Sequence, residues 1–95
     1  MWISTVTYNM IGLQGLDLDV ANGIRLAISD KRDILKTIDQ AGTALPGFEA
    51  PGIIDPNVAT YVVKRAWNTE SAAREFVDFV NTLSEFVTAT VEEQI

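Results

Sequence analysis

The sequence has no cysteine and no histidine, and only three prolines and six glycines among its 95 residues. Without cysteine the chain forms no disulfide. Without histidine it lacks a frequent general base and one of the usual ligands of zinc and copper. The common pairs of a nucleophile with an activating base are therefore excluded. Carboxylates, tyrosine, lysine, arginine, asparagine and tryptophan remain as the side chains that can take part in chemistry.

Long apolar runs and clustered positive charge are also missing. No apolar run reaches the ~18 residues of a membrane span, and the opening MWISTVTYNM lacks the basic and apolar segments of a signal peptide. Seven lysines and arginines stand against thirteen acidic residues, for a net charge of -6. Nucleic-acid binding usually needs clustered basic residues. We therefore expect a cytoplasmic protein that binds neither nucleic acid nor membranes.

The composition is that of a globular protein, with 47% hydrophobic and 21% charged residues. Because so short a chain has no room for a second core, we expect one domain over residues 1–95. Such a small core gives limited stability, and no disulfide adds to it. Dimerisation is therefore expected.

Three segments are predicted as strands, because they are rich in β-branched and aromatic residues or alternate between apolar and polar ones. They are residues 2–9, 58–67 and 86–92. After the second of these, Asn68 or Thr69 is expected to cap a helix, which presents Phe76 and other apolar residues on one face.

The segment between the first two strands allows alternatives. The glycines and aspartates of IGLQGLDLDVANG indicate a loop or an irregular lead into a helix. Either one helix then spans residues 20–41, or a short strand at 23–28 precedes a helix capped by Ser29 or Asp30. The helical repeat favours a helix, most clearly over residues 29–41, with Gly42 as its stop.

All three prolines lie in TALPGFEAPGIIDPN, which limits any strand there to a short edge strand around residues 48–54. The order strand, helix, strand, strand, helix, strand predicts an α+β fold of the ferredoxin-like βαββαβ type. Its four-stranded antiparallel sheet would carry two helices on one face. If Tyr61, Val63 and Trp67 point away from those helices, a second subunit or a ligand must cover them.

Four segments resemble the antibiotic biosynthesis monooxygenase family of the dimeric ferredoxin-like α+β barrel superfamily. They are LPGF at 45–48, the turn at Asp55, YVVKRAW at 61–67 and NTESAAREFVDFV at 68–80, within a resemblance that covers about residues 30–93. It implies a homodimer whose sheets pack face to face, with a small pocket between sheet and helices in each subunit. The family includes cofactor-free oxygenases of aromatic polyketides, haem-degrading enzymes and members with no established activity. Haem degradation needs an axial histidine, which this chain lacks, so we expect no cofactor.

Five residues are candidates for a ligand site: Tyr8, Asn9, Tyr61, Trp67 and Phe76. In an oxygenase they would line a pocket for a small aromatic molecule and polarise a carbonyl group, and the substrate itself would supply the carbanion. The alternative is structural, because aromatic residues on a sheet are usually core or interface anchors and asparagine is common where a strand ends. The sequence favours a non-enzymatic binding or structural homodimer that pairs through its sheet. A cofactor-free monooxygenase-like enzyme, or a binder of a small hydrophobic or aromatic ligand, is the second hypothesis.

The stretch DLDVANG suggests a calcium loop, since Asp17, Asp19 and Asn22 carry oxygen ligands. The spacing differs from that of an EF-hand, because Asn22 comes one residue late and Ile28 stands where the bidentate glutamate belongs. We therefore predict no metal site and interpret the two aspartates as helix-entry and loop residues.

Overall fold

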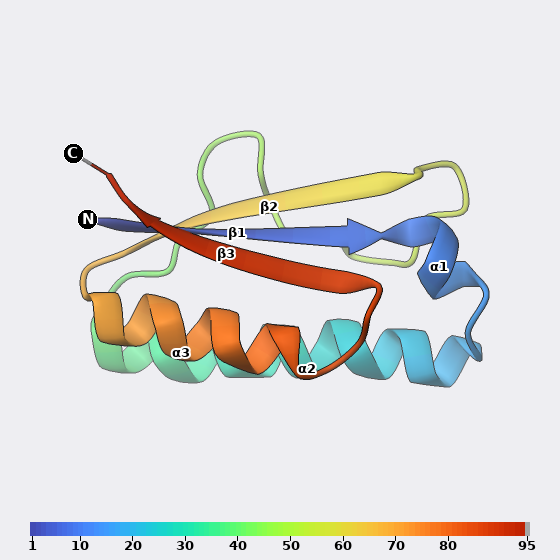
Figure 1. Ribbon diagram of the computed structural model, residues 1–95, viewed down its shortest axis with the longest axis horizontal. Coiled ribbons are helices and arrows are strands. Elements are labelled where there is room, and N and C mark those ends of the chain that lie inside the picture. Colours follow the sequence, from blue (N-terminus) through green and yellow to red (C-terminus); the bar gives the residue numbers. More distant parts are fainter. Residues whose placement is uncertain (95) are drawn as a thin grey trace.

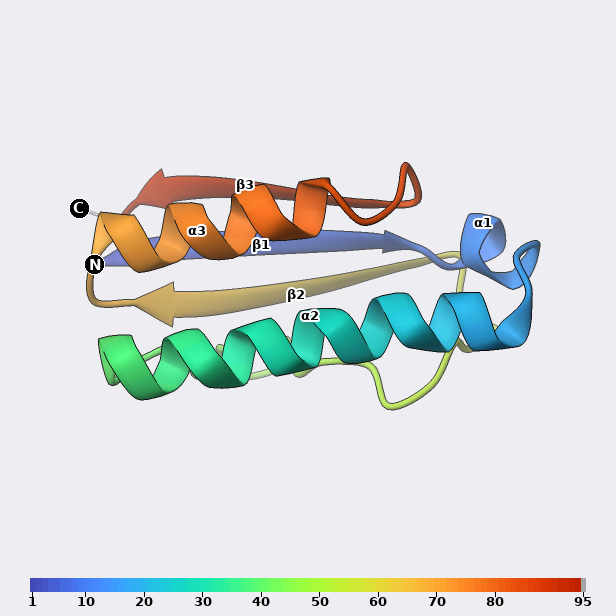
Figure 2. The ribbon, with the colours of Figure 1, turned by 90° about the horizontal axis from the view of Figure 1, so that it is seen from below.

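The computed structural model describes residues 1–94 and shows an α+β fold with three strands and three helices (Figure 1). In chain order the elements are β1 (Trp2–Asn9), α1 (Met10–Gln14), α2 (Leu18–Asp39), β2 (Thr60–Trp67), α3 (Glu70–Asn81) and β3 (Val87–Glu93). The strands form one antiparallel sheet in the order β2-β1-β3. Helices α2 and α3 run side by side on one side of the sheet, α3 beneath β1 and β3 and α2 toward the β2 edge (Figure 2).

The three predicted strands are confirmed to within two residues at each end. The central strand β1 pairs along its length with β2 and β3, so its side chains alternate between two environments. Ser4, Val6 and Tyr8 are buried toward the helices. The residues between them point to the opposite face, which no helix covers (Figure 1).

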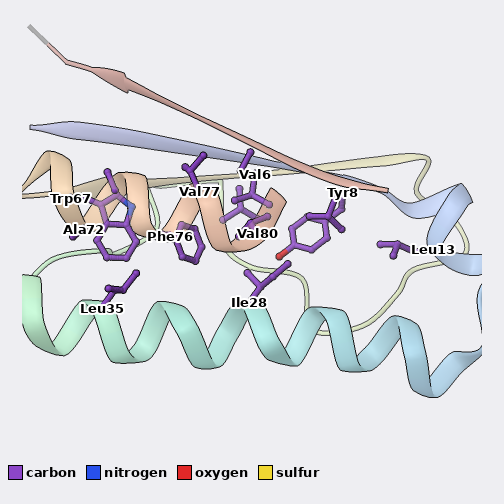
Figure 3. Packing of buried hydrophobic residues seen from close by; sticks show 14 of the residues in the cluster. Val6, Tyr8, Leu13, Ile28, Leu35, Trp67, Ala72, Phe76, Val77 and Val80 are labelled. Carbon is purple, nitrogen blue, oxygen red and sulfur yellow. The ribbon is translucent and has the colours of Figure 1, made fainter. Parts of the chain in front are cut away.

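Helix α3 begins as predicted, with Thr69 as the N-cap that accepts a hydrogen bond from the Ala72 N–H at 3.2 Å. Its buried stripe packs Phe76 against Trp67 from β2, with ring centroids 5.3 Å apart. Trp67 is 0% exposed and Val63 is 3% exposed. Both residues belong to the helix-facing core, where Figure 3 shows Trp67, and they need no second subunit to cover them.

Helix α2 is one continuous helix, so a separate strand at residues 23–28 is wrong. Ala21, Ile28 and Leu35 are buried at intervals of seven residues, which correspond to about two helical turns and so place them on one face. The helix ends at Asp39, and Gln40 in the left-handed conformation forms its C-cap.

The expected loop after β1 contains the short helix α1. The Asn9 side chain caps it by accepting a hydrogen bond from the Gly12 N–H at 3.0 Å. A Cβ atom at Gly12 would collide with the ring of Phe86, so the glycine permits close packing between α1 and the segment that leads into β3. Gly12 therefore makes room for the Phe86 ring and does not end the helix.

The edge strand expected at residues 48–54 is wrong. Residues 42–45 lie beside β2 instead: the Gly42 N–H donates to the Ala66 carbonyl at 2.7 Å and the Leu45 N–H to the Lys64 carbonyl at 2.9 Å. Residues 46–59 form turns and bends, because proline lacks the N–H that a ladder requires. Part of this segment rises on the side of the sheet opposite the helices (Figure 1). The sheet in residues 1–94 therefore has three strands and not four.

None of the helices in residues 1–94 combines the length and the apolar character that a membrane crossing requires.

Candidate functional site

A small cavity lies in the interior between the sheet, α2 and the segment that contains Ala50 and Pro51. Tyr8 and Arg65 line it from the sheet, and Arg25 and Arg32 line it from α2. Its volume is about 10 Å³, which is about the space that one water molecule needs. The cavity therefore accommodates one small group and not an aromatic ring system.

Three of the four arginines in the chain line this cavity. Arg65 is 6% exposed, and its Nη1 donates to the Gly42 carbonyl at 2.6 Å. Arg25 and Arg32 are seven residues apart on α2 and so share one face of the helix. The guanidinium of Arg32 pairs with Asp33 at 2.8 Å, whereas the buried Nε of Arg25 has no hydrogen-bond partner among the described residues.

Burial and the clustered charges shift two pKa values in the site. Burial lowers the pKa of Arg65 to about 10, and the charge of Arg32 acts in the same direction. Burial also raises the pKa of Tyr8 to about 12, against the opposing effect of the three arginines. At neutral pH the Tyr8 phenol is therefore uncharged and the Arg65 guanidinium is charged. The arrangement supplies hydrogen-bond donors and positive charge, which can bind an anion or a polarised oxygen.

The cavity includes two of the five residues singled out in the sequence. Tyr8 is 2% exposed and lines the cavity together with Phe76. Figure 3 shows the Tyr8 hydroxyl directed toward α2, next to Ile28. Tyr61 meets Tyr8 edge to face, with ring centroids 6.5 Å apart, but it does not line the cavity.

The other two residues have structural contacts. The indole Nε1 of Trp67 donates to Ser4 Oγ at 2.9 Å inside the core, and Trp67 does not line the cavity. Asn9 is exposed and holds the first turn of α1 through its hydrogen bond with Gly12. The structure therefore gathers the aromatic candidates in one core and places Asn9 outside it.

The three cavity arginines were not expected from the sequence. The signal for Arg65 was present, because strand alternation puts it on the same face as Val63 and Trp67, where a charged residue is unusual. Arg25 and Arg32 flank Ile28 on the buried side of α2. Their convergence with Arg65 depends on the tertiary structure, which no local pattern reveals.

Two open hollows lie elsewhere on the surface. One of about 210 Å³ lies between the end of α2 and the start of α3, next to Leu35 and Ala72. The other, of about 250 Å³, lies near Leu13 and Pro56.

In the part of the chain that is described, no group of three histidine, cysteine, aspartate or glutamate side chains is placed to hold a metal ion. Asp17 is the N-cap of α2 and accepts a hydrogen bond from the Asp19 N–H at 2.9 Å.

No protein-family model matches the chain, and searches of curated proteins and of solved structures gave no significant match.

Proposed function

We propose that the chain is a non-enzymatic binding or structural module, a ferredoxin-like subunit that forms a homodimer through its sheet. The observation that carries this proposal is the unequal covering of the two sheet faces. Helices α2 and α3 pack on one face, while no helix of residues 1–94 lies on the other (Figures 1 and 2). A second copy placed on that face would pack sheet against sheet, which is a common arrangement of antiparallel sheets.

The filled core argues for a binding or structural role over catalysis on a large substrate. Pockets for drug-sized ligands measure about 300–1,000 Å³. The interior cavity measures about 10 Å³, and Trp67, Phe76 and Val80 fill the space between sheet and helices. A polycyclic substrate has no room in this arrangement.

The face that carries no helix of residues 1–94, called the open face below, mixes polar side chains with apolar ones, and its Ile3 is 5% exposed. It consists of Ile3, Thr5, Thr7, Val62, Lys64, Ala66, Thr88, Thr90 and Glu92. Thr5 pairs with Thr90, and Thr7 pairs with Thr88 in the next row. Lys64 and Glu92 lie on the two outer strands, so a two-fold pairing of open faces can bring opposite charges together at its rim.

The strand order also supports a ferredoxin-like subunit. In the predicted βαββαβ order, the observed β1, β2 and β3 correspond to the first, third and fourth strands. Residues 42–45 run beside β2, on the edge where the second strand of that fold belongs. The resemblance to the antibiotic biosynthesis monooxygenase family adds the expectation of face-to-face sheets.

The test is the molar mass in solution, measured by light scattering coupled to size exclusion. We expect the wild type to have twice the mass of one chain. Thr5→Arg places a long charged side chain at the centre of the open face and should give a monomer that keeps its circular dichroism spectrum. Thr37→Arg, on the exposed part of α2, is the matched control and should remain dimeric. A monomeric wild type, or a dimeric Thr5→Arg variant, would contradict the proposal.

A cofactor-free oxygenase is the second candidate, and one observation favours it. Tyr8 and three arginines surround a single cavity, and such charges stabilise a developing enolate oxygen. Oxygen consumption in the presence of a single-ring phenol, of which only the oxygen would enter the cavity, tests this candidate. Uptake that is lost in Arg65→Gln would support it, and uptake no faster than in buffer alone would exclude that substrate class.

A further inference from the structure

We infer that Arg25, Arg32, Arg65 and Tyr8 form an internal binding site for a single oxyanion group, either a carboxylate or a phosphate. This site goes beyond the proposed dimer and does not depend on it, because every contributing residue belongs to one chain. The chemistry is that of a small anion recognised by guanidinium groups. Two observations carry the inference, the charge balance and an unpartnered donor, and a third observation limits how the ligand enters.

The charge balance in the cavity is positive although the chain as a whole is acidic. Three arginines line one small cavity in a chain with a net charge of -6. Asp33 pairs with Arg32, and the hydrogen bond of Arg65 goes to the Gly42 carbonyl, which carries no net charge. Like charges held together away from water repel one another, so an anion placed between them would offset this repulsion.

The second observation concerns hydrogen-bond donors. The Nε of Arg25 is buried and has no acceptor in residues 1–94, and a buried donor without an acceptor is unfavourable. The Tyr8 hydroxyl points toward the same helix, and it remains protonated at neutral pH (Figure 3). An oxyanion offers acceptor lone pairs to both groups. The planar fork of arginine also fits carboxylate and phosphate geometry better than it fits other ligands.

The third observation is size. A space of about 10 Å³ holds about one water molecule, so a carboxylate or phosphate group enters only if a wall of the cavity moves outward. Ala50 and Pro51 form the outer wall, and they belong to the segment 46–59, which contains no helix or strand. This segment can adjust around a ligand at a lower cost than the helices or the sheet can.

The direct test is an NMR titration of the arginine Nε–H signals in ¹⁵N-labelled protein. Sodium acetate and sodium phosphate are the probes, each compared with sodium chloride at equal ionic strength. We expect the signals of Arg25 and Arg65 to shift saturably. The signal of Arg74, which is exposed on α3 and paired with Glu70 at 2.9 Å, should stay in place. A response to acetate alone identifies a carboxylate site, a response to phosphate alone a phosphate site, and a response to both a general oxyanion site.

Variants provide the second readout, which is the rise in melting temperature that an anion causes when it binds the folded state. Arg25→Gln should weaken the affinity by about tenfold or more, because one charged donor is lost, and Arg74→Gln should leave it unchanged. If Arg25→Gln does not fold, Arg32→Gln replaces it. Failure of both probes to saturate, an equal shift of Arg74, or the same saturable shift with chloride would overturn the oxyanion proposal.

Discussion

Asp39 and Thr69 join the end of α2 to the start of α3. The Asp39 carboxylate accepts two hydrogen bonds from Thr69, from its backbone N–H at 3.1 Å and from its hydroxyl at 2.7 Å. The other carboxylate oxygen accepts the Asn68 N–H at 2.7 Å. Thr69 in turn caps α3 through the Ala72 N–H. One buried carboxylate therefore fixes the position of the two long helices relative to each other.

Replacement of this carboxylate by an amide tests the junction. In Asp39→Asn one oxygen becomes an NH₂ group, which places a donor opposite the N–H of Asn68 or Thr69. We expect the free energy of unfolding to fall by about 1–3 kcal/mol, as measured by urea denaturation. Asp30→Asn, at an exposed position of α2, is the control and should change stability little. Equal stability of the two variants would contradict a structural role for Asp39.

Gly42 is predicted to be intolerant of any side chain for two reasons. Its φ is +97°, which disfavours other residues, and a Cβ atom there would lie 2.8 Å from Cη2 of Trp67. Gly47 has a φ of +82° with no atom within 4 Å of an added Cβ, so Gly47→Ala measures the backbone cost alone. We expect Gly42→Ala to lower the melting temperature more than Gly47→Ala does. The difference between the two shifts in melting temperature measures the effect of the contact with Trp67. Equal shifts would show that the indole moves aside without cost.

The two tryptophans should differ in their contribution to stability. Trp67→Ala removes a fully buried ring and its hydrogen bond to Ser4, so we expect a loss of about 3–5 kcal/mol in chemical denaturation. Trp2→Ala removes a half-buried ring that lies 5.9 Å from the guanidinium of Arg74, and the loss should be smaller. If Trp67→Ala kept the wild-type stability but lost a ligand, Trp67 would belong to a binding pocket and not to the core.

Tyr8 should make stability depend on pH in the alkaline range. Burial raises its pKa from 10.0 to about 12, so between these values the unfolded chain releases the phenolic proton while the folded chain retains it. Stability therefore falls as the pH rises through this window. Tyr8→Phe removes the effect. Between pH 9.5 and 11.5 the unfolding free energy of the wild type should therefore fall by about 2 kcal/mol more than that of the variant. The lowered pKa of Arg65 affects the stability of both proteins, so it does not account for a difference between them. Parallel plots of stability against pH would contradict the raised pKa of Tyr8.

Elements specified by neighbouring residues were predictable from the sequence. The alternation within β1 and the cap at Thr69 are local signals, and both elements occur where they were expected. Helix α1 was missed because Gly12 indicates a break, whereas the ring of Phe86 is the reason for this glycine. That contact joins segments far apart in the sequence, and a local pattern does not contain it.

The edge pairing beside β2 and the cavity also depend on contacts between segments that are far apart in the sequence. Residues 42–45 pair with β2, and residues 48–54 do not. The segment 42–45 contains no proline, so its N–H groups can donate hydrogen bonds, whereas Pro46 and Pro51 follow it and lack an N–H. Tyr8 and Phe76 were candidates for a ligand site because of their aromatic rings, and they line the cavity. Arg65 was not among the candidate site residues. Its role in the cavity became visible once α2 brought Arg25 and Arg32 to the same place.

The separation of charge in this molecule has a kinetic consequence. Apart from the three cavity arginines, only four basic side chains remain against thirteen acidic ones. An approaching anion is therefore repelled at long range and attracted only after it has passed the surface. Added salt screens the repulsion between exposed charges more than it screens the buried attraction. The association rate of an anion should therefore increase with ionic strength, in contrast to the salt dependence of electrostatically steered encounters.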